Sequence, residues 1–235
     1  MLLNEQCLLG IEGTGQAVSV GIMLKGLARG CLFLDTGKPG SEMLLSAIDQ
    51  LLSMSGLDKK DLEGICVTQG PGSFTSMRIS LAIAESLGLG LNIPLYGVDA
   101  LTLMAKTVPY YSGTIKVIRN AYKGEFYVAS FCYKKGILHR MSEIELVTPR
   151  AFYEKLVEGE LVLGDGLIKL EGDGFDLNQK KVNRNKDFAR QITGIHVVEY
   201  FLNETNRAPS VVPLEPIYIR LSEAEINYDK QFQKR

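Results

Sequence analysis

The chain has 235 residues, of which 46% are hydrophobic and 23% charged, and its formal net charge is −1. This composition is typical of a globular chain with a sizeable core, and the balanced charge excludes a protein that binds nucleic acid or anionic membranes through overall positive charge. Residues 79–93 form the longest apolar stretch, which is too short to span a bilayer, and no signal peptide precedes them, so we expect a cytoplasmic protein.

The first part of the chain predicts three antiparallel strands followed by alternating helices and strands. Residues 7–11 form an apolar run, residues 18–24 alternate between apolar and smaller side chains, and Lys25-Gly26 predicts a tight turn into a strand at 27–34. The elements expected next are a helix from Ser41 to Gly56, a strand at 65–68, a helix from Ser73 to Gly88 or Gly90, a strand at 95–98 and a helix at 99–108.

A second lobe is expected from Gly113 onward. Its expected elements are strands at 115–118, 126–132, 137–147 and 161–163, a helix at 149–157, a polar loop at 172–186, and a final helix capped by Asp187 with Phe188, Ile192, Ile195 and Leu202 on one side. The predicted fold class is α/β, in two lobes that each have a mixed sheet covered by helices. The expected division is an N-terminal lobe at 1–112, a C-terminal lobe at 113–220 and a peripheral tail at 221–235.

The chain's central motif is the turn Gly70-Pro71-Gly72-Ser73 between a buried strand and a helix. Backbone N–H groups at a helix start suit an anion, but the same layout suits close packing, and both hypotheses stay open. No lysine follows the glycines as in a phosphate-binding loop, and Thr75 stands where a third glycine would complete a dinucleotide or serine-elbow motif. We interpret Ser73 as a helix cap rather than a nucleophile.

Arg78 lies one turn into this helix, where the helix dipole disfavours a cation. An exposed, solvated side chain is the simpler interpretation. The alternative is that Arg78 pairs with a buried carboxylate or with an anionic ligand near the turn, and Glu12 and Asp165 are the first carboxylates to consider.

Two more glycine turns follow predicted strands, at Gly13 to Gly15 and at Gly164 to Gly166. Opposed across a cleft between two lobes, such turns hold phosphate and ribose groups. The candidate nucleotide-binding residues are Glu12, Thr14, Gly164, Asp165 and Gly166.

Histidine and cysteine do not form a metal-binding pattern in this sequence. The two histidines, His139 and His196, are far apart, and the cysteines at 7, 31, 66 and 132 form no close pair. All four cysteines lie in apolar strand-like runs, so we expect buried free thiols. No metal site and no catalytic residue are predicted.

The order of motifs identifies a family. Residues 70–79, Gly-Pro-Gly-Ser-Phe-Thr-Ser-Met-Arg-Ile, resemble the hallmark Gly-Pro-Gly-Ser-Phe-Thr-Gly-Leu-Arg-Ile of the TsaB (YeaZ) family. Weaker matches are Ser41-Glu42 with Leu44-Leu45, and the segments 124–127, 163–166 and 216–220. The resemblance extends from Cys7 to Arg220.

The resemblance implies an actin-like ATPase fold (ribonuclease H-like, of the ASKHA class) and a non-catalytic scaffold role in tRNA threonylcarbamoyladenosine modification. The implied partners are a TsaD-type transferase subunit and a TsaE-type ATPase, with tRNA contacted indirectly through the complex and a homodimer as the state of the chain alone. ATP or ADP at the subunit interface is the only cofactor the resemblance suggests.

Pairing in this family uses the first two helices. The resemblance therefore implies a partner interface on the Ser41 and Ser73 helices, formed by Leu44, Leu45, Ile48, Leu52, Phe74, Met77, Arg78 and Leu81. Apolar faces of this kind are otherwise explained as core, although Leu45, Leu52 and Ile83 lie off the main face.

Four positions depart from the family pattern. The chain has Glu12-Gly13-Thr14 for Asp-Thr-Ser, Gly40 for the His before Ser41-Glu42, Asn120-Ala121-Tyr122 for Asp-Ala-Arg, and Ser76-Met77 for Gly-Leu. The altered first turn argues further against ATP hydrolysis by this chain alone. The rival hypotheses are a peptidase or hydrolase and a stand-alone nucleotide-binding protein of the actin-like class.

Overall fold

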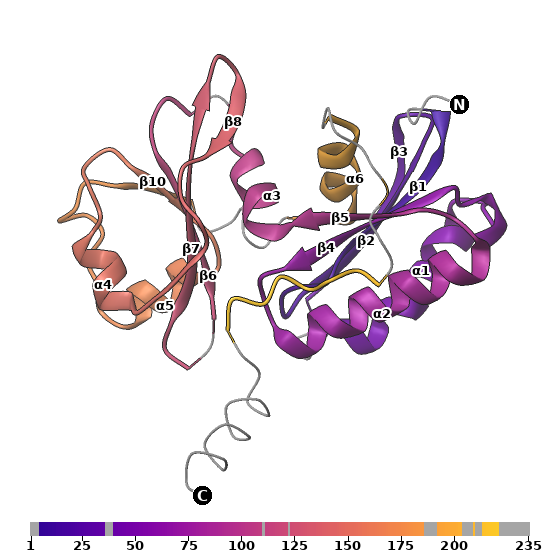
Figure 1. Cartoon of the computed structure of the whole chain (residues 1–235), viewed down its shortest axis with the longest axis horizontal. Coiled ribbons are helices and arrows are strands. Elements are labelled where there is room, and N and C mark those ends of the chain that lie inside the picture. The colour runs from indigo at the N-terminus through magenta and orange to yellow at the C-terminus, as the bar shows by residue number, and fades with distance from the viewer. Residues whose placement is uncertain are drawn as a thin grey trace, which may run out of the picture.

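The computed structural model describes residues 5–35, 40–109, 111–121, 123–185, 192–203, 209 and 213–220. These residues form two mixed sheets with helices on their outer faces and between them (Figure 1). The tail at 221–235, with Asp187 and Phe188 of the expected final helix, lies outside the described residues.

The first sheet has the strand order β3-β2-β1-β4-β5, with β1–β3 antiparallel and β4 and β5 parallel to β1. Its strands are β1 (Cys7–Glu12), β2 (Val18–Leu24), β3 (Leu27–Leu34), β4 (Gly64–Gly70) and β5 (Leu95–Asp99). Lys25 and Gly26 have φ of 54° and 73°, as a tight hairpin turn requires. The three-strand opening and its turn are therefore confirmed.

The helical elements that follow these strands begin with a short 3-10 segment where one continuous helix is predicted. They are η2 (Gly40–Met43), α1 (Leu44–Met54), η3 (Lys59–Asp61), α2 (Phe74–Leu91) and α3 (Ala100–Lys106). Ser73 caps α2, because its side chain accepts the Ser76 N–H. Asn92 ends the helix in the left-handed conformation, with φ of 53°.

The second sheet repeats the arrangement of the first. Its order is β11-β10-β6-β7-β8, again with three antiparallel strands and two parallel ones, and β9 pairs with β7 beside β8. The elements are β6 (Ile115–Asn120), β7 (Phe126–Lys134), β8 (Ile137–Arg140), β9 (Glu145–Val147), α4 (Pro149–Glu154), β10 (Leu161–Leu163), α5 (Gly166–Gly172), β11 (Asn183–Asn185) and α6 (Gly194–Asn203). One unit used twice is the organisation of the actin-like fold.

Some predicted elements were wrong in detail. The expected strand at 137–147 is two short strands, β8 and β9, which both pair with β7 and are separated by residues 141–144. The expected polar loop at 172–186 contains β11, and α5 precedes it. Of the cysteines, only Cys7 and Cys66 are buried, whereas Cys31 on the edge strand β3 is exposed and Cys132 is partly buried.

Helix α6 lies against β1 and β2 of the first sheet, although it follows the second sheet in the sequence. Its most buried side chains are Val197, Val198 and Phe201. The predicted Ile195 and Leu202 are partly buried against the same apolar cluster, and Ile192, just before the helix, is buried in it. The close approach depends on glycine: a Cβ at Gly10 would lie 1.8 Å from the Gly194 carbonyl oxygen. The chain thus returns to its first sheet, and the division at residue 112 stays a prediction.

Three apolar clusters hold the two sheets and their helices together. One lies between the first sheet and helices α1 and α2, a second lies under α4 and α5, and the third fills the space between the sheets around α3 and α6. Because α3 contacts both sheets, it joins them through packed side chains. Within the described residues, no helix has the length and apolar character needed to cross a membrane.

Candidate functional site

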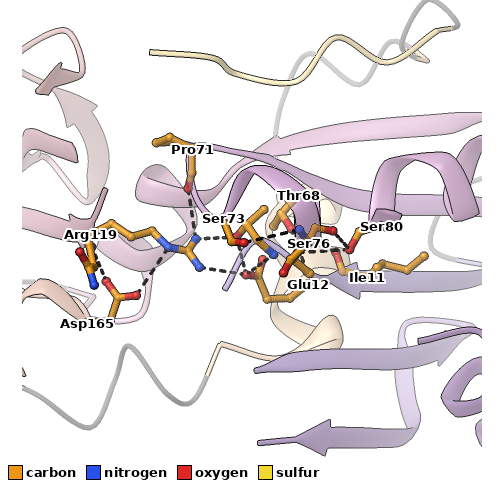
Figure 2. Close-up of polar contacts among 12 residues, drawn as sticks. Ile11, Glu12, Thr68, Pro71, Ser73, Ser76, Ser80, Arg119 and Asp165 are labelled. Atoms are coloured by element: carbon orange, nitrogen blue, oxygen red, sulfur yellow. Dashed lines mark hydrogen bonds and ion pairs between the residues drawn. The ribbon is translucent and has the colours of Figure 1, made fainter. Parts of the chain in front are cut away.

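The buried guanidinium of Arg119, on β6 of the second sheet, lies between the turns that end β1 and β4 of the first (Figure 2). Its side chain is only 5% exposed. Nη1 donates to Thr14 Oγ1 at 2.5 Å and to the Pro71 carbonyl at 3.4 Å. Nη2 lies 3.5 Å from Glu12 Oε1, and Nε lies 3.9 Å from Asp165 Oδ2. One side chain therefore ties the two halves of the molecule together.

The turn after β1 is organised by Glu12. Its Oε1 accepts the Thr14 N–H at 3.2 Å and the Thr14 hydroxyl at 2.6 Å. Oε2 of Glu12 is buried and has no hydrogen-bond partner in the described structure. A buried carboxylate of this kind is costly without a cation nearby, and Arg119 supplies that cation.

Asp165 approaches Arg119 from the start of α5. Its Oδ1 accepts the Asn120 N–H at 2.9 Å, which fixes the carboxylate beside the end of β6. Burial raises the pKa of the Asp165 carboxyl, and the Arg119 guanidinium opposes that shift. Glu12, Thr14 and Asp165 thus come together as the sequence suggested, but around Arg119.

The glycines of the candidate nucleotide cleft are closely packed against the chain itself. A Cβ at Gly164 would lie 1.9 Å from the Ile118 carbonyl oxygen, and one at Gly72 would lie 2.0 Å from the Thr14 carbonyl oxygen. At Gly166 the nearest neighbour would be the Ile118 side chain, at 3.1 Å. Both Gly164 and Gly166 therefore face protein atoms of β6.

The turn before α2 is held by hydrogen bonds within the chain. The Ser73 N–H donates to the Thr14 carbonyl at 2.7 Å, and the Ser73 side chain caps the Ser76 N–H. Close packing at this turn is therefore confirmed for Gly72 and Ser73, whereas an anion at the amides that begin α2 stays a prediction. A cavity of about 160 Å³ lies beside Arg119, and the residues that border it include Glu12, Phe33, Asp35 and Asp165.

Neither histidine is placed to activate Ser73. His196 accepts the Thr193 N–H through Nδ1 at 3.1 Å, and His139 lies on β8 opposite Cys132. In the described part of the chain, no group of three or more His, Cys, Asp or Glu side chains is arranged to hold a metal ion.

Arg78 does not pair with Glu12 or Asp165, so the two carboxylates expected for it were wrong. Its side chain is exposed, its guanidinium lies 4.0 Å from the centre of the Phe74 ring, and its Nε donates to the Tyr218 hydroxyl at 2.7 Å. The carboxylates proposed for it are held by Arg119.

The predicted interface residues divide into two groups by exposure. Five are buried in the chain's own core, with exposed fractions of 0% to 3%: Leu44, Ile48, Leu52, Met77 and Leu81. Leu45 is 47% exposed, Arg78 is exposed and Phe74 is partly buried. Only this second group can contact a partner directly in the conformation described.

The sequence interpretation missed Arg119 and Tyr218. Arg119 interrupts the apolar run of β6, and that charged residue at a strand end was the available signal. Its partners lie 48 and 105 positions away in the chain, so no local spacing connects them.

Comparison with known proteins places the chain beside a set of tRNA-modification proteins. The model of the TsaD family, tRNA N6-adenosine threonylcarbamoyltransferase, matches residues 35–189. The tRNA threonylcarbamoyladenosine biosynthesis protein TsaB of Bacillus subtilis is 29% identical over 197 residues, which cover 81% of this chain and 84% of that protein. TsaB of Buchnera aphidicola (subspecies Schizaphis graminum) is 30% identical over 146 residues, covering 59% of this chain and 70% of that protein.

A solved structure from Pseudomonas aeruginosa, described as an uncharacterized protein with similarity to peptidase YeaZ, has the same fold. It superposes with a TM-score of 0.70 at 17% identity, covering 92% of this chain and all of that one.

Proposed function

The chain belongs to the TsaB (YeaZ) family of tRNA threonylcarbamoyladenosine biosynthesis proteins, and from this premise we propose that it is a non-catalytic scaffold subunit of that pathway. It pairs with a TsaD-type transferase, which carries out threonylcarbamoylation of the adenosine beside the anticodon of tRNA. Membership in the pathway favours neither rival, the peptidase or the stand-alone nucleotide-binding protein.

The observation that carries the proposal is the set of contacts that Arg119 makes across the cleft. Arg119 bridges the Glu12–Thr14 turn and Asp165, and the N–H of Ser73, the residue that caps α2, donates to the Thr14 carbonyl. Groups that would handle phosphate in an enzyme of this fold are therefore engaged with one another. The chain's contribution is then its shape, with α1 and α2 as a rigid surface for a partner.

The further partners follow from the same family. We propose that a TsaE-type ATPase joins the complex, that tRNA is contacted through the complex, and that the chain forms a homodimer when its partner is absent. The proposed site of action is the cytoplasm. ATP or ADP would be bound only at the interface between subunits. The cleft within this chain would be closed by the residues of its two turns, Glu12, Thr14, Gly164, Asp165 and Gly166.

The test is association of the full chain with a TsaD-type transferase. Size-exclusion chromatography with light scattering should show a complex of defined stoichiometry, with a mass above that of either protein alone. Two unshifted peaks at concentrations of tens of micromolar would contradict the scaffold role. They would mean a dissociation constant above that concentration, at which the partner would be left unbound.

A further inference from the structure

The segment at 213–220, here called the C-terminal strap, runs beside α2 and on toward the second sheet (Figure 1). Leu214 is 4% exposed within the apolar cluster under α1 and α2, and its N–H donates to Glu85 on α2. The Ile217 N–H donates to the Gln69 carbonyl at 2.9 Å, and Gln69 Nε2 donates to the Glu215 carbonyl at 2.9 Å. The strap is therefore fixed to the first sheet by both main-chain and side-chain bonds.

The far end of the strap is bound to the second sheet. Arg220 forms an ion pair with Glu125 and donates to the Ala121 carbonyl at 3.3 Å. Between these two attachments, the Tyr218 ring is held beside the first turn of α2. Its centre is 5.0 Å from that of Phe74, with 28° between the ring planes.

Arg78 lies between the strap and the helix. Its guanidinium is over the Phe74 ring at 4.0 Å and is 5.5 Å from the centre of the Tyr218 ring, and its Nε donates to the Tyr218 hydroxyl at 2.7 Å. No carboxylate among the described residues pairs with it. Two ring contacts and one hydrogen bond thus fix the guanidinium plane and leave Nη1 and Nη2 as donors.

The exposed side of α2 is almost free of charge. Its exposed positions are Thr75, Arg78, Ala82, Ser86, Leu89 and Gly90, and Arg78 is the one ionisable residue among them. Solvated helix faces normally carry several charged residues, whereas the centres of protein interfaces are depleted in charge and enriched in Arg and aromatic residues.

We propose that the C-terminal strap is part of the partner-binding surface, and that Arg78 receives a carboxylate of the partner subunit. This inference rests on the proposed function, because that partner is the transferase-type subunit. Tyr218 is a positioning residue: it orients the fork of Arg78, whose two free nitrogens match a carboxylate. A single cation among small uncharged residues fits a protein surface better than a nucleic acid, which is bound through several cations.

The test measures affinity for the transferase-type partner by isothermal titration, using full-length variants. Arg78→Ala should weaken binding by about 10-fold or more, as central Arg anchors do. Arg78→Lys should not restore it, because an ammonium lacks the planar fork. Tyr218→Phe keeps the ring but loses the hydroxyl, so it should weaken binding by a smaller factor. Arg150→Ala, which removes an arginine 82% exposed on α4, is the matched control and should bind as wild type.

Salt dependence separates a charge contact from loss of packing. The affinity of the wild-type chain should fall as salt rises, and that of Arg78→Ala should fall less steeply. Equal slopes, or wild-type binding by Arg78→Ala and Tyr218→Phe in folded protein, would overturn the inference. If Leu45→Glu weakened binding in that case, the scaffold role would stand and only the inference about Arg78 would fail. If the wild-type chain did not bind the transferase at all, the proposed function itself would have failed.

The chain's own tail offers another source of carboxylates, at Glu223, Glu225 and Asp229. Neutralising all three together, as Glu223→Gln, Glu225→Gln and Asp229→Asn, should leave partner affinity unchanged. A loss of affinity equal to that of Arg78→Ala would assign the contact to the tail and contradict the proposal.

Discussion

Substituting Arg119→Met should lower the free energy of unfolding by about 3–5 kcal/mol, the cost of leaving buried carboxylates without their cation. Arg119 is 5% exposed and Glu12 8% exposed at their side chains, so solvent cannot replace the lost contacts. Asp165, at 37% exposure, contributes less. Urea unfolding followed by circular dichroism measures the change in the free energy of unfolding. The control Arg150→Ala breaks an exposed ion pair and should lower that free energy by about 0.5 kcal/mol or less.

The ionic origin of that loss can be separated from lost packing. Adding Glu12→Gln to Arg119→Met removes the uncompensated charge, while the amide oxygen of the new side chain can still accept from Thr14, so the double variant should recover part of the stability. The folded pKa of Asp165 lies above its ordinary value of 3.8, so the cost of its ionised form is relieved as pH falls through the folded pKa. Relative to wild type at the same pH, the deficit of Arg119→Met should shrink toward acid. A loss of stability in Arg119→Met that changed neither with Glu12→Gln nor with pH would contradict an ionic role for Arg119.

Leu45→Glu should weaken association with the transferase partner by roughly 100-fold and leave the chain folded. Leu45 is 47% exposed on α1, so the isolated chain can solvate the new carboxylate at a cost of about 0.5 kcal/mol or less. An interface would bury that carboxylate without a partner, at a cost of about 3 kcal/mol, or roughly 100-fold in affinity. Isothermal titration of the folded variant against the partner measures the change.

Two further variants serve as controls for Leu45→Glu. Ile137→Glu places the same charge on the exposed strand β8 of the second sheet and should bind as wild type. Leu44→Glu changes the neighbouring residue, which is 0% exposed, and should unfold the chain. If Leu45→Glu binds as tightly as Ile137→Glu, then α1 is not the partner surface.

Much of the first sheet could be predicted from the sequence, because its signals are local. The alternation in β2, the Lys25-Gly26 turn and the Ser73 cap each lie within a few residues of the structure they specify. The family resemblance, carried by residues 70–79, is also confirmed by the relatives and fixes the fold. The short elements α5 and β11 carry too few apolar residues to produce a periodic signal.

The site was less predictable, because its contacts are between residues distant in the sequence. Arg119 and Thr14 are 105 positions apart, and Tyr218 and Arg78 are 140 apart. An apolar helical face also does not say what it packs against: Leu44 and Leu45 have the same side chain, yet only Leu45 faces outward. The sequence left core and interface open for these helix faces, and the sheet decides for core at Leu44, Ile48, Leu52, Met77 and Leu81.

We propose that the chain promotes threonylcarbamoyl transfer without catalysing it. The most direct measurement is reconstituted transfer to tRNA by a TsaD-type transferase and TsaE-type ATPase, with and without this chain. We expect modification of the tRNA only when the chain is present together with the transferase, and none by the chain alone. With Leu45→Glu, the amount of modified tRNA should fall in proportion to the fraction of transferase that the variant no longer binds. Undiminished transfer in the absence of the chain, or transfer by the chain without the transferase, would contradict that claim.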